Sequence, residues 1–193
     1  SQLPGASLGK TFTAENYLAA EHGGAGFTGA LASEYTDLAR NQADMVRWMN
    51  ATAFMTKAQQ AEGGSAPAPW TPDQLGVNGE ASAKYDEVVA AIEANKSQRP
   101  EACARAQAMW DQYLFILRAE ANGANCPLTS EEALAMLNEA IAACDPPVDV
   151  ANNYVVYFGF DKTNLTSRAT TTITDAADAY ETIYYRFRLS WAI

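Results

Sequence analysis

The sequence predicts a mainly α protein: an extended arm over residues 1–25, a helical domain over residues 26–147, and a partial α/β unit of strand, helix and strand over residues 148–193. Two observations carry this prediction. Apolar residues recur every three or four positions through most of the stretch from Phe27 to Cys144, which is the spacing of one helix face. After Pro147 that spacing gives way to a β-branched and aromatic run, which is typical of a strand.

The first 25 residues contain four glycines and little periodicity, so an arm or loop is expected there. The longest periodic stretch then begins at Phe27 and ends before Gly63-Gly64. Its apolar residues are spaced to share one face: Phe27, Leu31, Tyr35, Leu38, Met45, Met49 and Phe54. We expect one long helix of roughly 50 Å, at 1.5 Å per residue. Because that is longer than a compact domain of this size needs, part of the helix is expected to project or kink.

A helical hairpin is predicted in the second half of the helical domain. It is preceded by a proline-rich linker over residues 65–79 and by a helix with Tyr85, Val88, Val89 and Ile92 on one face. The first helix of the hairpin begins after Pro100 and ends near Ala121. The second begins with a capping box of Thr129 and Glu132, and Asp145-Pro146-Pro147 ends it.

The three cysteines allow two interpretations. Cys103 and Cys144 lie at similar sequence distances from the turn of the predicted hairpin, and each is on its helix's apolar stripe. A disulfide between them would fasten the open end of the hairpin and add roughly 2–4 kcal/mol of stability. The alternative is two buried thiols that pack as small apolar groups. We favour the disulfide, with Cys126 free in the loop.

The charge and motif content argue against several functions. The net charge of −10 makes nucleic acid a poor partner, and no apolar run approaches the roughly 20 residues that span a bilayer. The sequence has neither C-x-x-C nor G-x-S-x-G, and its one histidine, His22, is expected on a surface loop. We therefore predict no enzyme, no cofactor and no metal site.

The strand after Pro147 resembles a known family. Residues Val155-Val156-Tyr157-Phe158-Gly159-Phe160-Asp161-Lys162, then Leu165-Thr166 and a helix, resemble the opening strand and helix of the OmpA-like peptidoglycan-binding domain. The motif is carried by Tyr157, Phe158, Phe160, Asp161 and Leu165. Gly159 departs from the pattern, since the family has an aspartate there. The family's peptidoglycan contacts are an aspartate and an arginine downstream of the second strand, and neither is matched up to Ile193, so we carry over no binding residue.

The helical region, with Glu34-Tyr35, Leu38-Ala39, Phe54, Lys57-Ala58 and Ala106-Gln107, is similar to the N-terminal half of alphaproteobacterial lipoproteins that carry such a domain. Together the two resemblances imply a non-enzymatic, periplasmic, outer-membrane-associated protein that scaffolds the envelope near peptidoglycan. Ser1-Gln2 suits the residues after a lipidated cysteine.

The implied partners are other envelope proteins or copies of the chain itself, and peptidoglycan only with the rest of the domain. The alternative is a structural subunit of a larger envelope or surface assembly, docking through its long helix and an exposed C-terminal strand.

Overall fold

The computed structural model describes residues 13–77, 79–146 and 167–178. The chain divides into two units, Ser1–Pro146 and Pro147–Ile193, and each is considered by itself. Throughout the described ranges every regular element is an α-helix, which confirms the mainly α prediction. The predicted strands and the five motif residues Tyr157, Phe158, Phe160, Asp161 and Leu165 lie outside these ranges. In the second unit, residues 167–178 are helical, where the sequence predicts a helix after Leu165-Thr166.

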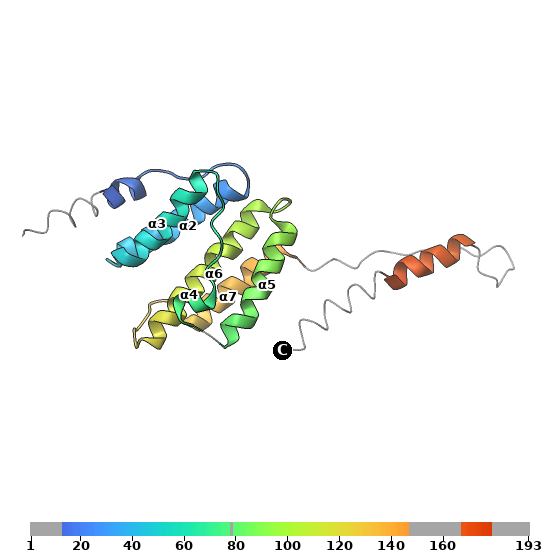
Figure 1. Ribbon diagram of the computed structural model, residues 1–193. Helices are drawn as coiled ribbons and strands as arrows, with labels where there is room; N and C mark the ends of the chain where they lie inside the picture. The colour runs from blue at the N-terminus through green and yellow to red at the C-terminus, as the bar shows by residue number, and fades with distance from the viewer. Residues whose placement is uncertain (1–12, 78, 147–166, 179–193) are drawn as a thin grey trace, which may run out of the picture. The chain divides into compact units, whose positions relative to one another are not determined.

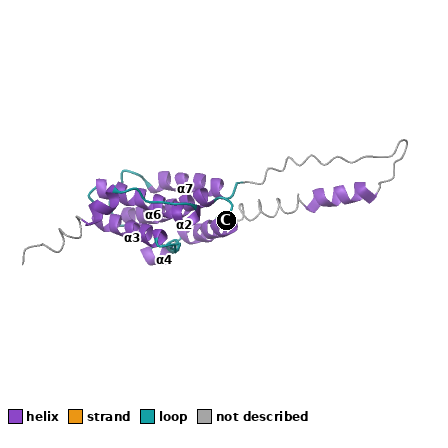
Figure 2. Ribbon diagram, turned by 90° about the horizontal axis from the view of Figure 1, so that it is seen from above, coloured by secondary structure: helices purple, strands orange, loops and turns teal. Residues whose placement is uncertain are grey.

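The first unit is a bundle built around one central helix (Figure 1). After a short helix over residues 13–19, its helices are α2 (Gly26–Asp44), α3 (Trp48–Glu62), α4 (Pro72–Leu75), α5 (Glu80–Asn95), α6 (Pro100–Ala121) and α7 (Ser130–Cys144). Helix α6 contacts α2, α4, α5 and α7, and α2 also packs along α3 (Figure 2).

The predicted hairpin is present as α6 and α7. Pro100 occupies the first turn of α6, where its missing N–H costs no hydrogen bond. The predicted capping box is confirmed: the Thr129 hydroxyl accepts from the Glu132 N–H, and the Glu132 carboxylate accepts from the Thr129 N–H. Trp110, Leu114 and Leu137 are buried between the helices.

The prediction of a single long helix from Phe27 to Glu62 is wrong, because the chain turns at Met45–Arg47 and returns as α3. Helix α2 ends in a Schellman motif: the Val46 N–H bonds to the Ala43 carbonyl and the Arg47 N–H to the Gln42 carbonyl, both at 2.8 Å. Val46 occupies the left-handed position of this motif, with φ of 58°. Glycine normally marks such a stop, so the sequence carried no signal for it.

The turn also changes which residues are buried. Met45 and Met49 were expected on the buried face of the long helix. Instead their side chains are 39 % and 88 % exposed, since both lie beside the turn.

Candidate functional site

The most connected polar group of the bundle is the carboxylate of Asp111 in α6, which is fully buried. Its Oδ2 accepts hydrogen bonds from the Tyr35 hydroxyl and from the Lys57 ammonium, both at 2.6 Å. Its Oδ1 accepts from the backbone N–H of Trp70 at 2.8 Å. One carboxylate therefore joins α2, α3, α6 and the loop before α4.

The side chain of Lys57 is only 9 % exposed, and its ammonium finds its partners within the protein. Besides Asp111, its ammonium donates to the Ala68 carbonyl at 2.7 Å, and it lies 3.8 Å from the centre of the Trp70 ring. Burial lowers the pKa of Lys57 and raises the pKa of Asp111, while the attraction between the two charges opposes both shifts. Because burial is the larger influence on both pKa values, the attraction within the pair offsets its desolvation only in part.

Two further α6 side chains hold the same loop. Gln107 donates from Nε2 to the Pro67 carbonyl at 2.6 Å and to the Tyr35 hydroxyl at 2.9 Å. Trp110 donates from Nε1 to the Trp70 carbonyl at 2.8 Å. We call this set the Asp111 clamp: Tyr35, Lys57, Gln107, Trp110 and Asp111 with loop residues 67–70. Since its groups face one another and not solvent, the clamp fixes structure and offers no reactive group to a substrate.

The clamp was not predicted from the sequence, although one signal for it was present. Gln107 and Asp111 are four residues apart and share the inward stripe of α6 with Cys103 and Leu114. Polar residues on an apolar stripe indicate a buried polar contact, because an unpaired one would be destabilising.

His22 lies in a loop, as the sequence predicted, but its side chain is largely buried. Its side chain is 9 % exposed and its ring stacks on Tyr17, with the ring centroids 3.8 Å apart. Nδ1 lies 2.5 Å from Oε1 of Glu62, and Nε2 lies 2.6 Å from the Tyr17 carbonyl oxygen. Both ring nitrogens are therefore occupied, and neither is open to a substrate.

The surroundings of His22 tie residues 13–24 to α2 and α3. The Tyr17 hydroxyl donates to Glu62 at 3.0 Å, and burial together with Glu62 raises the pKa of Tyr17 to about 12. The hydrogen bond from His22 lowers the pKa of Glu62. Arg40 of α2 donates to the carbonyls of Leu18 and Ala20, at 2.7 and 2.5 Å.

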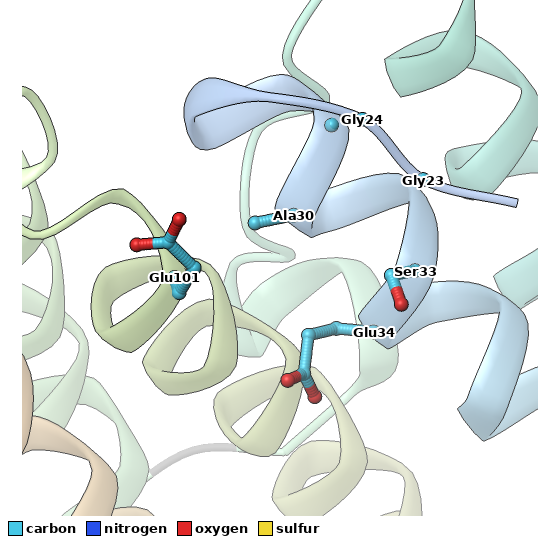
Figure 3. Close-up of a pocket in the computed structure, with 7 residues that line it drawn as sticks. Gly23, Gly24, Ala30, Ser33, Glu34 and Glu101 are labelled. Atoms are coloured by element: carbon cyan, nitrogen blue, oxygen red, sulfur yellow. The ribbon is translucent and has the colours of Figure 1, made fainter.

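A hollow of about 270 Å³ lies between this segment, α2 and the start of α6 (Figure 3). It is lined by Gly23, Gly24, Gly29, Ala30, Ser33, Glu34 and Glu101. Burial raises the pKa of Glu34, an effect that Arg105 opposes, its guanidinium lying 3.6 Å away. Glu101 complements the dipole of α6 from its first turn. Each carboxylate thus has a structural explanation, and the hollow indicates no particular ligand.

The predicted cysteine pair lies at disulfide distance. The sulfurs of Cys103 and Cys144 are 2.14 Å apart and their Cα atoms 4.6 Å apart, which joins the start of α6 to the end of α7. Cys126 is a free thiol, half-buried in the loop between these helices.

Two properties concern the described residues alone. Within them, no group of histidine, cysteine, aspartate and glutamate side chains is arranged to hold a metal ion. None of the helices described is both long and apolar enough to cross a bilayer.

No protein-family model, curated protein or solved structure matches the chain. The resemblance to the OmpA-like domain therefore stays a prediction that depends on the residues quoted for it.

Proposed function

We propose that the chain is a non-enzymatic protein of the bacterial cell envelope, periplasmic and associated with the outer membrane. In this proposal the helical unit is a rigid scaffold, and the C-terminal OmpA-like segment lies near peptidoglycan. The observation that carries the proposal is the pair Cys103 and Cys144 at disulfide distance. Structural disulfides persist in oxidising compartments such as the periplasm and are rare in the cytosol.

The Asp111 clamp supports the scaffold part of the proposal. Four hydrogen bonds hold the loop before α4: side chains of α3 and α6 donate to the carbonyls of Pro67, Ala68 and Trp70, and the Trp70 N–H donates to the Asp111 carboxylate. A loop held in this way cannot shift without breaking buried, charge-assisted bonds. Such rigidity suits a protein that presents surfaces to partners.

Thiol trapping in the native host tests the compartment. Cells are quenched with acid, and the unfolded protein is alkylated with a reagent that adds mass to each free thiol. We expect one modified cysteine, identified as Cys126 by peptide mapping, and three after chemical reduction. Reduced samples serve as the control for accessibility. Three modified cysteines without reduction would place the protein in a reducing compartment and refute the proposal.

Sedimentation with purified peptidoglycan tests the ligand part. The 193-residue chain is expected to stay in the supernatant, because the family's aspartate and arginine contacts are not among its residues. A chain carrying a complete OmpA-like domain is the positive control and should pellet. Specific retention of the 193-residue chain, competed by soluble peptidoglycan fragments, would contradict this expectation.

The second candidate function is a subunit of a larger envelope assembly. The observation that favours it is the exposed apolar turn between α2 and α3, which lies within the stretch predicted to form one long docking helix. Sedimentation of cell extracts distinguishes the two candidates, since an assembly subunit migrates with a large complex.

A further inference from the structure

The turn between α2 and α3 exposes more apolar side chain than its own fold requires. Met45, Val46 and Met49 are 39 %, 75 % and 88 % exposed. Of the residues described, Ile173 is the one other large apolar side chain with comparable exposure, at 43 %, and it belongs to the second unit. Three neighbouring apolar side chains on one turn form a patch that water solvates poorly and that a partner surface can cover.

The backbone of this turn is strained at Val46, one of its exposed apolar residues. A β-branched side chain at φ of 58° is unfavourable, and glycine at this position of a Schellman motif would avoid the strain. In the isolated chain, Val46 is 75 % exposed and so gains little from packing. A residue that is both strained and exposed is explained if its side chain makes a contact outside the isolated chain.

Two charges beside the turn indicate what kind of surface covers it. Asp44 is the last residue of α2 and Arg47 the residue before α3, and neither side chain has an ion-pair partner among the described residues. Each charge also lies at the unfavourable end of its helix, since an anion at a C-terminus and a cation at an N-terminus both oppose the helix dipole. Both would be stabilised by a surface that offers a cation next to Asp44 and an anion next to Arg47.

A second copy of the same turn offers that surface. In a twofold contact each residue faces its complement on the other copy, so Asp44 of one chain meets Arg47 of the other, and the reverse pair forms at the same time. The apolar side chains of Val46 and Met49 then meet at the axis. We propose that residues 44–49 form a contact between two copies of this chain. This inference rests on the proposed scaffold function and names its partner.

Sedimentation velocity of the full chain, over a wide concentration range, tests the contact. A single turn per chain buries little area, so we expect a reversible dimer that forms at high protein concentration. Met49→Lys should weaken association at least tenfold, because it places two cations at the axis. Ile173→Lys is the matched control and should leave association unchanged. Because both side chains are exposed, circular dichroism should show both variants folded.

A charge exchange distinguishes a second copy from any other partner. Asp44→Arg alone and Arg47→Asp alone each create two like-charge contacts across the twofold axis and should weaken the dimer several-fold. The double variant Asp44→Arg/Arg47→Asp restores both pairs within the same dimer and should associate like the unaltered chain. Failure of the double variant to recover would overturn the self-complementary arrangement.

Cys126 provides an independent readout. Its side chain lines the same small hollow as Arg47 and Asn50, so it lies close to the turn. A short thiol-specific bifunctional crosslinker, used without reductant, should trap covalent dimers of the unaltered chain and none of Cys126→Ser. Met49→Lys should reduce the trapped fraction, whereas Ile173→Lys should not.

The outcomes separate this inference from the proposed function. A chain that stays monomeric at every concentration, or a dimer that is indifferent to Met49→Lys, overturns the contact. Binding of the monomeric chain to lipid vesicles through the same turn would also overturn it and assign the patch to a membrane. None of these results changes the thiol-trapping result, which tests the compartment alone.

Discussion

Lys57→Met isolates the energetics of the Asp111 clamp. Methionine keeps an apolar stem of similar length against Trp70 but removes the charge that faces Asp111. The carboxylate then keeps its bonds from Tyr35 and from the Trp70 N–H, both shorter than 3 Å. Breaking a buried ion pair on one side is destabilising by about 3–5 kcal/mol, because the remaining charge is uncompensated. We expect a loss of about 3 kcal/mol at neutral pH.

The loss should depend on pH in a direction fixed by Asp111. Burial already raises the pKa of Asp111 in the folded protein, and Lys57 is the largest influence that holds it down. Without Lys57 the folded-state pKa rises further, so the folded variant binds a proton more tightly than the unfolded chain does. The stabilisation that Asp111 contributes is then fully present below the pKa of the unfolded chain. It decreases as the pH rises through the pKa of the folded variant. The variant should therefore recover on acidification, by at most about 1.4 kcal/mol per pH unit.

Urea unfolding followed by circular dichroism at pH 7, 6 and 5 measures both effects. Lys57→Met/Asp111→Asn keeps the shape of the clamp without either charge, so it should recover part of the loss and show no added pH dependence. Lys96→Met is the matched control: its pair with Glu93 is exposed, and its loss should stay below about 1 kcal/mol. A loss below about 1 kcal/mol for Lys57→Met, equal at all three pH values, would refute the reasoning.

Three further predictions concern other contacts. Cys103→Ser should lower the free energy of unfolding by about 3–4 kcal/mol in urea titrations, given the 41-residue separation of the pair, while Cys126→Ser should change it little. In Gly29→Ala the new Cβ would lie 2.2 Å from the Gly24 backbone, so the two segments would have to separate. Residues 13–24 should then become open to cleavage by a glutamate-specific protease. In Gly24→Ala the atom nearest to the new Cβ is 3.7 Å away, and cleavage should stay slow. Because the pKa of Glu62 is lowered in the folded protein, the stability that its carboxylate contributes is present above its ordinary pKa and lost as the pH falls. Glu62→Gln should therefore lower the free energy of unfolding less in acid than at neutral pH. Equal losses at the two pH values would contradict this.

The sequence was most informative where structure is encoded by neighbouring residues. The capping box of Thr129 and Glu132 and the proline at position 100 mark helix ends through local chemistry, so α6 and α7 could be anticipated. Their antiparallel pairing then followed from a short loop, and it placed Cys103 opposite Cys144.

Two features could not be predicted, each for a physical reason. The stop after α2 depends on a valine in the left-handed region, where glycine is the usual signal, so no residue marked it. The clamp depends on which helices meet: Asp111 is 54 residues from Lys57 and 76 from Tyr35. Periodicity tells which face of a helix is buried, and it does not tell which other face lies opposite.

The Asp111 clamp has a consequence for how the bundle comes apart. Its carboxylate has all of its partners only while three separate helices and one loop are in place, so the departure of any one leaves a buried charged group with fewer hydrogen bonds than it needs. Intermediates with a single element detached are thereby penalised, and loss of structure becomes an all-or-nothing event. The amide hydrogen of Trp70, although in a loop, should then exchange with solvent as slowly as the deepest helical amides.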